Sequence, residues 1–249
     1  MSHSSPTART TSRCLGSEPT ELAEARSLLA QAYDVVDHQV RICNSTFTIL
    51  GVCDTYALLD RISPEEFQRD ERLPYWGDMW PSSIALARWC LKEGQLKGKR
   101  ILELGCGLGL AGISAARAGA IVVMSDYEED ALAFANYNVR ANGPTTDQIS
   151  CYFMDWRSPE TIPECDIIVG SDVVYEEKNI EPIVQILQTA RIQYSVFTDP
   201  QRRTCGKFIN ALQQRGFLVE SHSSNVILKG PPTTVMLHVV RSGDSRGTS

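Results

Sequence analysis

Three acidic residues lie at or near the ends of short apolar runs in the middle of this 249-residue chain. They are Glu103, Asp126 and Asp172, and a tyrosine, Tyr175, follows the last of them. Carboxylates accept hydrogen bonds from hydroxyl groups and amines, and they can take up a proton from a reacting amine. Side chains that follow parallel strands meet at one edge of a sheet. We therefore predict that these residues line one binding site.

A glycine cluster sits beside the first of these acids. Gly105, Gly107 and Gly109 follow an apolar run directly and precede a helical segment of small residues. Glycine has no Cβ and accepts positive φ, so this layout lets the backbone approach a nucleotide-type ligand closely. A carboxylate at Glu103 would repel a pyrophosphate and suits a cationic ligand. The alternative is a tight strand–helix turn that binds nothing.

From residue 100 onward the chain alternates between apolar runs and helical segments. Near-continuous apolar runs indicate strands that are buried on both faces, as in a parallel sheet. The pattern therefore predicts an α/β fold. The expected strands are Arg100–Leu104, Ile121–Ser125, Ile149–Met154, Ile167–Gly170, Ser195–Thr198, Phe217–Ser221 and Thr233–Val240, and the expected helices are Leu110–Ala118, Glu128–Asn142, Asn179–Thr189 and Gly206–Arg215.

Before residue 100 the pattern is less regular. We expect residues 18–240 to form one domain with an N-terminal extension at 18–72, and residues 1–17 and 241–249 to be disordered tails. The first tail is rich in serine, threonine and arginine, so a transit peptide for an organelle such as the mitochondrion is the alternative. The expected elements are a helix at Glu18–Tyr33, a strand or hairpin at Val40–Val52, a short helix within Tyr56–Asp70, and a helix from Ser82 to Lys92 capped by Ser82 or Ser83.

Composition narrows the function classes. The formal net charge of −6 argues against a dedicated nucleic-acid binder. No apolar run approaches the roughly 20 residues that span a bilayer, so we expect no membrane partner. The eight cysteines form no CxxC pair, which argues against a metal site and fits a reducing compartment. We therefore expect a cytoplasmic protein, and we expect it to be a monomer.

The segment Glu103-Leu-Gly-Cys-Gly-Leu-Gly109 resembles motif I of class I methyltransferases that use S-adenosylmethionine. That resemblance implies a Rossmann-like, doubly wound, seven-stranded sheet, mostly parallel with an antiparallel last strand, here with a small N-terminal helix and hairpin added. It also implies that the three glycines pack against the cofactor and that Glu103 lies near its methionine moiety. Asp126 would bind the ribose. The alternative for Asp126 is an N-cap of the following helix.

Two further motifs in the same order strengthen the resemblance. Ser171-Asp172-Val-Val-Tyr175 matches the Asp-x-x-Tyr motif of seven-β-strand protein lysine methyltransferases, and a Trp80-Pro-Ser segment precedes motif I as in that branch. The match is strongest to enzymes like the electron transfer flavoprotein β-subunit lysine methyltransferase. It implies cofactor contacts for Trp80 and Ser171. Asp155 and Trp156 would bind the adenine, and the alternative for Trp156 is a core position.

The resemblance implies an N-methyltransferase whose partner is a protein substrate and whose target is a lysine side chain. Asp172 would orient the amine or receive its proton, and Tyr175 would line the channel. Three alternatives stay open: a small-molecule enzyme for nicotinamide or another amine, an enzyme for arginine or histidine side chains, and a cofactor-binding module without catalysis. Arg202 or Arg203 could meet an acidic protein surface or lie in a solvated turn.

Overall fold

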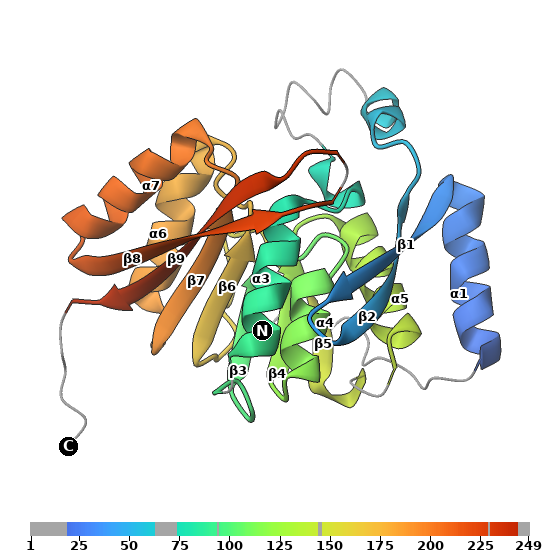
Figure 1. Ribbon diagram of the computed structural model, residues 1–249, viewed down its shortest axis with the longest axis horizontal. Coiled ribbons are helices and arrows are strands. Elements are labelled where there is room, and N and C mark those ends of the chain that lie inside the picture. Colours follow the sequence, from blue (N-terminus) through green and yellow to red (C-terminus); the bar gives the residue numbers. More distant parts are fainter. Residues whose placement is uncertain (1–18, 63–73, 94, 144–145, 229, 244–249) are drawn as a thin grey trace, which may run out of the picture.

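The computed structural model describes residues 19–62, 74–93, 95–143, 146–228 and 230–243. At its centre is a seven-stranded sheet of order β5-β4-β3-β6-β7-β9-β8 (Figure 1). The first five strands in this order are parallel, and β9 pairs antiparallel with both β7 and β8. The predicted sheet with an antiparallel last strand is confirmed. The strands are β3 Arg100–Leu104, β4 Ile121–Asp126, β5 Ile149–Phe153, β6 Ile167–Ser171, β7 Tyr194–Asp199, β8 Phe217–Val226 and β9 Thr233–Ser242.

Helices cover both faces of this sheet because alternate strand residues are apolar on both sides. In β3, Ile101 packs into the core beneath α3, α4 and α5, whereas Leu102 packs into the core beneath α6 and α7. The sheet is therefore doubly wound. The helices are α3 Pro81–Lys92, α4 Leu110–Arg117, α5 Glu129–Ala141, α6 Ile180–Thr189 and α7 Arg203–Gln214. None of the helices among the described residues has the length and apolar content needed to cross a membrane.

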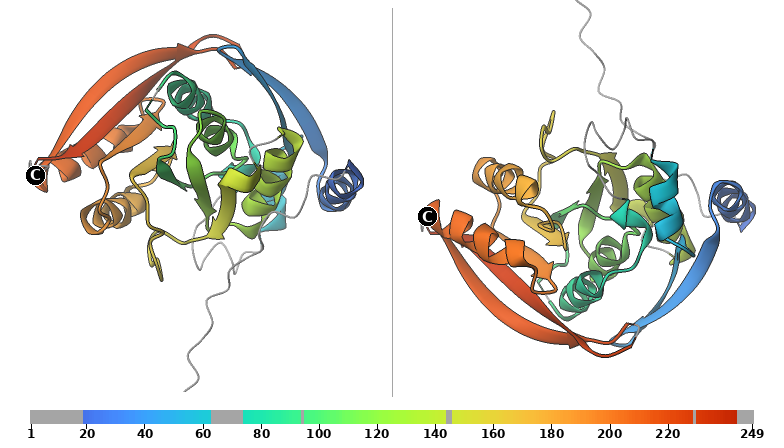
Figure 2. Two further views of the ribbon diagram at one scale, coloured as in Figure 1. Left: turned by 90° about the horizontal axis from the view of Figure 1, so that it is seen from below. Right: turned by 90° about the horizontal axis from the view of Figure 1, so that it is seen from above.

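The N-terminal extension consists of α1 (Pro19–Ala32) and a hairpin of β1 (Val35–Ile42) and β2 (Ser45–Val52). Figure 2 shows this hairpin and the β8–β9 pair curving around the side of the molecule that carries α3. The hairpin begins five residues before the predicted Val40, and the first half of β1, residues 35–38, contains no fully buried residue. Short 3-10 turns lie at η1 Tyr56–Arg61, η2 Tyr75–Gly77, η3 Thr146–Gln148 and η4 Glu177–Asn179.

Three sequence expectations are corrected. Helix α3 begins at Pro81, and neither Ser82 nor Ser83 caps it: Ser82 is buried, and the Ser83 hydroxyl donates to the Trp80 carbonyl at 2.8 Å. Proline suits the first helical position because its φ is already set. Strand β8 continues five residues past the expected Ser221. The sequence did not indicate this extension because polar residues, which are common on edge strands, interrupt the apolar pattern. Strand β9 reaches Ser242, inside the expected C-terminal tail, and the expected tail at 1–17 lies outside the described residues.

One edge of the hairpin is closed by side chains in place of a third strand. Leu50 donates its N–H to the Asn138 side-chain oxygen at 2.7 Å and accepts from the Asn138 amide at 3.0 Å. Thr48 exchanges the same two bonds with Asn142, at 2.9 and 2.8 Å. The two asparagines are one helical turn apart, a rise of about 6 Å that matches the spacing of alternate strand residues. Helix α5 therefore binds the β2 edge as a partner strand would.

Asn138 also reaches the glycine turn after β3. Its amide donates to the Leu108 carbonyl at 3.0 Å, and the side chain is fully buried. Arg117 of α4 closes the next position of the β2 edge by donating to the Thr46 carbonyl at 3.1 Å. These bonds attach the extension to the glycine turn, whose residue Leu108 also lines a cavity at the carboxyl edge of the parallel strands.

Replacing Asn138 by alanine should destabilise the protein by about 2–4 kcal/mol, because three buried backbone groups lose their partners. Urea unfolding of the variant and the wild type measures this difference. Asn210→Ala, at an exposed position of α7, is the matched control and should change stability by less than about 0.5 kcal/mol. Equal stability of Asn138→Ala and the wild type would show that the hairpin does not depend on this side chain.

Candidate cofactor and active site

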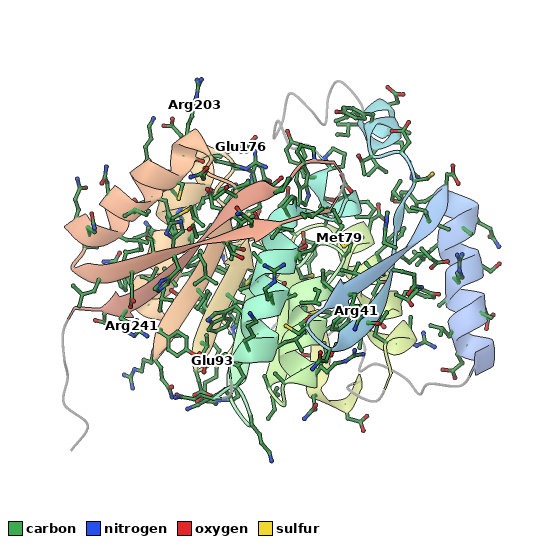
Figure 3. The ribbon with its side chains drawn as sticks, viewed as in Figure 1. Arg41, Met79, Glu93, Glu176, Arg203 and Arg241 are labelled. Atoms are coloured by element: carbon green, nitrogen blue, oxygen red, sulfur yellow. The ribbon has the colours of Figure 1, made fainter. Side chains whose placement is uncertain are left out.

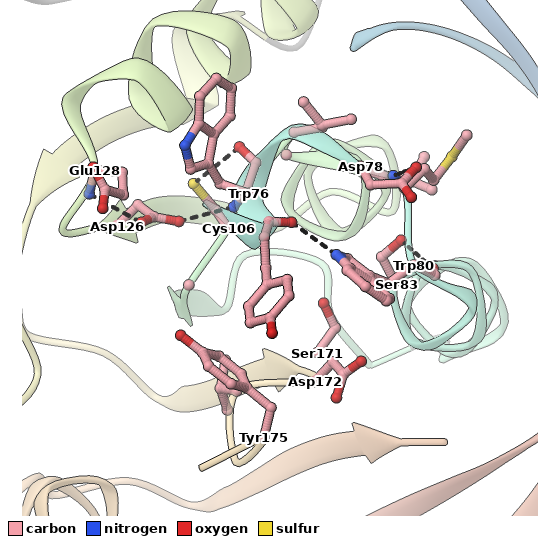
Figure 4. A pocket seen from close by; sticks show the side chains of 18 of the residues that line it. Trp76, Asp78, Trp80, Ser83, Cys106, Asp126, Glu128, Ser171, Asp172 and Tyr175 are labelled. Carbon is pink, nitrogen blue, oxygen red and sulfur yellow. Dashed lines mark hydrogen bonds between the residues drawn. The ribbon is translucent and has the colours of Figure 1, made fainter. Parts of the chain in front are cut away.

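A single cavity opens at the carboxyl edge of the parallel strands, and residues from several strand ends and from the segment before α3 line it. Figure 4 shows Asp126 and Glu128 on one side of this cavity, and Ser171 and Asp172 on the other. This is where ligands bind in open α/β sheets. The lining residues are Tyr75, Trp76, Asp78, Met79, Trp80, Ser83, Gly105, Cys106, Gly107, Leu108, Gly109, Leu110, Asp126, Tyr127, Glu128, Trp156, Ser171, Asp172, Val173, Tyr175 and Arg202.

The glycine turn after β3 forms the floor between these two sides. Gly105, Gly107 and Gly109 all have positive φ, at 61°, 50° and 84°, a backbone conformation that glycine adopts without strain. A Cβ at Gly105 would lie 2.9 Å from atoms of both Trp156 and Val173. The residue type is therefore required here for the backbone angle and for space, and the three glycines line the cavity as predicted.

Asp126 ends β4 and ties this turn in place. One carboxylate oxygen accepts the Gly107 N–H at 3.0 Å, and the other accepts the Glu128 N–H at 3.1 Å. Burial raises the pKa of the Asp126 carboxyl to about 6, against the lowering effect of those backbone bonds. Helix α5 has Glu128 at its N-cap position, without a side-chain cap bond. Asp126 thus lies in the cavity wall, two residues before the N-cap.

Glu103 lies in β3, close to the glycine turn. It shares the α4 face of β3 with Ile101, so its side chain is buried beneath the helix and does not line the cavity. A Cβ on Gly112 of α4 would meet its Oε2 at 2.5 Å. Burial raises the pKa of Glu103 to about 8, opposed by a hydrogen bond from the Gly112 N–H. Glu103 therefore lies under the first turn of α4, and its predicted contact with the methionine moiety of the cofactor stays a prediction.

Asp155 and Trp156, which follow β5, also differ in whether they line the cavity. Trp156 is 3% exposed and lines the cavity, with its ring centroid 5.8 Å from that of Tyr127. Asp155 forms an ion pair with Arg157 at 2.6 Å and is not among the lining residues. The tryptophan can therefore offer an apolar face to a ring. The predicted contact of Asp155 with adenine finds no support in its position.

Aromatic side chains make the opposite wall. The Trp80 indole N–H donates to the Tyr75 carbonyl at 2.8 Å, and the Tyr75 ring lies 5.9 Å from the Trp80 ring and 5.2 Å from that of Tyr175. Trp76 lies beside the glycine turn. The sequence predicted that the three aromatic residues of this proline-flanked segment, Tyr75, Trp76 and Trp80, form a wall for the cofactor or substrate, and all three line the cavity.

Asp172 follows β6 and forms an ion pair with Arg202. Arg202 donates its Nε to Asp172 Oδ1 at 2.5 Å and its Nη2 to Oδ2 at 2.8 Å. Its guanidinium carbon lies 5.7 Å from the centre of the Trp80 ring. The sequence predicted that Arg202 or Arg203 either meets an acidic protein surface or lies in a solvated turn; in the structure Arg202 lines the cavity and pairs with Asp172. The signal was the Asp199-Pro-Gln-Arg turn, whose position after β7 places it beside β6.

Tyr175 interacts with a second tyrosine, Tyr127. Its hydroxyl forms a side-chain hydrogen bond with that of Tyr127, and burial raises the pKa of both phenols. Tyr127 directly follows Asp126, so this contact joins the two sides of the cavity. Tyr127 is a lining residue that no motif indicated.

The arrangement fits a cationic nucleoside cofactor such as S-adenosylmethionine. Acidic side chains line the cavity at Asp78, Asp126, Glu128 and Asp172, whereas Arg202 is the only basic lining residue in the described part of the chain. Backbone at a positive-φ glycine turn permits close approach, Asp126 offers a carboxylate to hydroxyl groups, and Trp156 offers an apolar face to a base. Among the described residues, no cluster of three or more histidine, cysteine, aspartate or glutamate side chains could hold a metal ion.

Replacing Glu103 by glutamine should change how stability depends on pH. The folded-state pKa is raised from 4.5 to about 8, so across this window the folded protein keeps a proton that the unfolded chain has released. The free energy of unfolding of the wild type therefore falls as pH rises, by at most about 1.4 kcal/mol per pH unit from this group. Glutamine cannot ionise. The stability of Glu103→Gln relative to wild type should rise between about pH 5 and about pH 8 in urea unfolding, and parallel curves would contradict the assignment.

Comparison with known proteins places the chain in a family. Residues 67–214, more than half of the chain, match the lysine methyltransferase family. Histone-arginine methyltransferase METTL23 of Xenopus laevis is 33% identical over 142 residues, covering 54% of this chain and 61% of that protein. Protein N-lysine methyltransferase METTL21A of Danio rerio is 36% identical over 125 residues, covering 47% and 56%. The chain thus matches less than two thirds of the length of these relatives.

Solved structures share the fold. The magnesium protoporphyrin IX methyltransferase of Synechocystis PCC 6803 with bound S-adenosylmethionine superposes with a TM-score of 0.53 at 20% identity, covering 77% of this chain and 99% of that one. The methyltransferase domain of bacterial CtHen1-C gives a TM-score of 0.55 at 13% identity, covering 66% and 100%. Because the family match spans residues 67–214, which carry the glycine turn, Asp126 and the Asp172–Tyr175 motif, this chain belongs to the lysine methyltransferase family.

Proposed function

We propose that this protein transfers a methyl group from S-adenosylmethionine to the side-chain nitrogen of a lysine in a protein substrate. The observation that carries the proposal is that one cavity joins the glycine turn and Asp126 to Asp172 and Tyr175. The family match supports the reaction class, and the relatives METTL21A and the electron transfer flavoprotein beta subunit lysine methyltransferase of Danio rerio are named for lysine. Cytoplasmic location and a monomeric state stay predictions.

The cofactor half of the cavity is the side of Asp126. Its carboxylate would accept hydrogen bonds from the ribose hydroxyls, the backbone at Gly105, Gly107 and Gly109 would pack against the cofactor, and Trp156 would cover the adenine. Each Asp126 oxygen has a second lone pair beyond the one used by the backbone N–H groups. The turn is thereby already in place before the cofactor binds, which lowers the ordering cost of binding.

The reaction half is the side of Asp172. S-adenosylmethionine supplies a sulfonium methyl: the amine lone pair bonds to its carbon while the carbon–sulfur bond breaks, and the positive charge passes from sulfur to nitrogen. The lysine must first lose its proton, since an ammonium has no lone pair, and a free lysine has a pKa of about 10.4. Asp172 would accept a hydrogen bond from the amine or take up its proton. Tyr175, Tyr75 and Trp80 would wall the channel and exclude water.

Asp126→Asn should weaken the binding of S-adenosylhomocysteine by about 10- to 100-fold, since a charge-assisted hydrogen bond contributes about 1.5–3 kcal/mol. Asparagine keeps an oxygen for the Gly107 N–H, so the unfolding midpoint should change little. Isothermal titration calorimetry measures the affinity. Asp155→Asn, whose side chain lies outside the cavity, is the matched control and should bind as the wild type does. Equal loss in both variants would contradict the placement of the ribose at Asp126.

Asp172→Asn should lower methyl transfer by about 100-fold or more, the range for a positioned acid–base group, while cofactor binding persists. The assay incubates the protein with radiolabelled S-adenosylmethionine and a cell lysate, resolves the products on a gel, and maps the modified residue by mass spectrometry. Glu177→Gln, an exposed carboxylate outside the cavity, is the control.

A labelled protein band, lost in Asp172→Asn and carrying methyl-lysine, is the expected result. Label on arginine or histidine would change the target residue, and label only in the small-molecule fraction would favour the amine or nicotinamide alternative. Cofactor binding without any transfer would leave a binding module.

A further inference from the structure

We infer that Arg202 is a positioning residue for Asp172, and that the resulting neutral pair makes the site select an uncharged amine over a cationic side chain. This inference rests on the proposed function. Arg202 lies 30 positions after Asp172 and outside the Asp-x-x-Tyr motif. Its role is to hold and balance the carboxylate through direct hydrogen bonds.

Arg202 and Asp172 form a bidentate salt bridge. Both oxygens of Asp172 accept from the guanidinium, at 2.5 and 2.8 Å, and the Asp172 side chain is 6% exposed against 34% for Arg202. A planar guanidinium fixes a carboxylate in direction as well as in position. The pKa of Arg202 is raised above its ordinary value, first by this hydrogen bond, so the guanidinium stays charged. The Trp80 ring beneath it fixes the plane further.

Hydrogen bonds position the loop after β6, which carries Asp172, and the loop after β7, which carries Arg202. The Asp172 N–H donates to the Thr198 carbonyl at 2.8 Å, which sets the start of one loop. The Arg202 N–H donates to Asp199 Oδ1 at 2.9 Å, which sets the other. Asp172 and Gln201 both have positive φ, at 59° and 64°. Residues other than glycine adopt this conformation at a cost in free energy, so the surrounding contacts must hold both loops in it.

The pair changes what the cavity can bind. The charged and titratable groups around Asp172 are Arg202 in contact, Asp199 beneath, and Tyr75 and Tyr175 in the walls, with Asp78 and Glu128 further along the cavity. With its charge balanced by Arg202, Asp172 attracts a second cation weakly. Its remaining lone pairs still accept an N–H from a neutral amine.

The consequence separates lysine from arginine as a target. A lysine can lose its proton to water on entering a desolvated channel, and the neutral amine then accepts the methyl group. A guanidinium stays protonated at ordinary pH and would need an unbalanced carboxylate opposite it. In this cavity the protein's own guanidinium occupies that place on Asp172.

The test uses Arg202→Gln, Arg202→Lys and the control Arg203→Gln. Arg203 is the next residue, is exposed, and points outward from the top of α7 in Figure 3. For each protein we would measure cofactor affinity by calorimetry, and kcat and KM with the protein substrate found above. The affinity for methylguanidinium, a small cation that mimics an arginine side chain, would be measured by NMR without any protein substrate, with Asp172→Asn as the reference for binding elsewhere.

Arg202→Gln should lower kcat by about 10- to 100-fold with cofactor affinity unchanged within about twofold, and Arg203→Gln should match the wild type. An unbalanced carboxylate attracts a cation more strongly, so methylguanidinium should bind at least about tenfold more tightly to Arg202→Gln than to the wild type. Arg202→Lys should restore the charge and the weak binding of methylguanidinium, but not the two parallel hydrogen bonds and hence not the full kcat.

Equal affinity of Arg202→Gln and the wild type for methylguanidinium would overturn the inference, whatever the activity. Unchanged kcat in Arg202→Gln would overturn it too. Absence of transfer to any protein by the wild type would instead contradict the proposed function, and the binding of methylguanidinium would still decide the role of Arg202.

Discussion

The hydrogen bond between the Gly107 N–H and the Asp126 carboxylate is the contact on which the cavity depends. It joins the turn after β3 to the end of β4, beside a backbone bond from the Cys106 N–H to the Ser125 carbonyl at 2.9 Å. The Ser125 hydroxyl donates a hydrogen bond to the Glu103 carbonyl at 2.6 Å. Because these bonds fix the two strand ends together, the left-handed glycines hold their shape without a ligand. The backbone surface that faces the cavity is therefore preorganised.

The two halves of the cavity differ in which groups pair with their carboxylates. Near Asp126 the carboxylate is satisfied by backbone N–H groups alone, so its side of the cavity remains negative and suits a cofactor that carries a positive charge. Near Asp172 the carboxylate is paired with Arg202, so that side is balanced. Methyl transfer carries a positive charge from the first side to the second. A balanced pair beside the new ammonium lets the product leave more easily than an isolated carboxylate would.

Much of this site could be predicted from the sequence because its parts are local. The glycine turn, Asp126 and Asp172 each follow an apolar run, and the sheet edge brings such positions together. The direction of Glu103 was also available, since alternation along β3 puts it on the face of Ile101, but the motif suggested otherwise. Contacts across the sheet are different. The paired hydrogen bonds between Arg202 and Asp172 need a left-handed residue in each of two loops, Asp172 and Gln201. Neither residue type nor spacing predicts those backbone angles.

The closure of the β2 edge by α5 has a consequence for how the chain matures during synthesis. Leu50 and Asn138 are 88 positions apart, and Thr48 and Asn142 are 94 apart. At about 5–20 residues per second, the hairpin waits roughly 5–20 s on the ribosome before its partner helix exists. Throughout that interval its open edge can pair with any other strand. The nascent chain therefore passes through a stage in which chaperone occupancy of residues 45–52 would protect the fold.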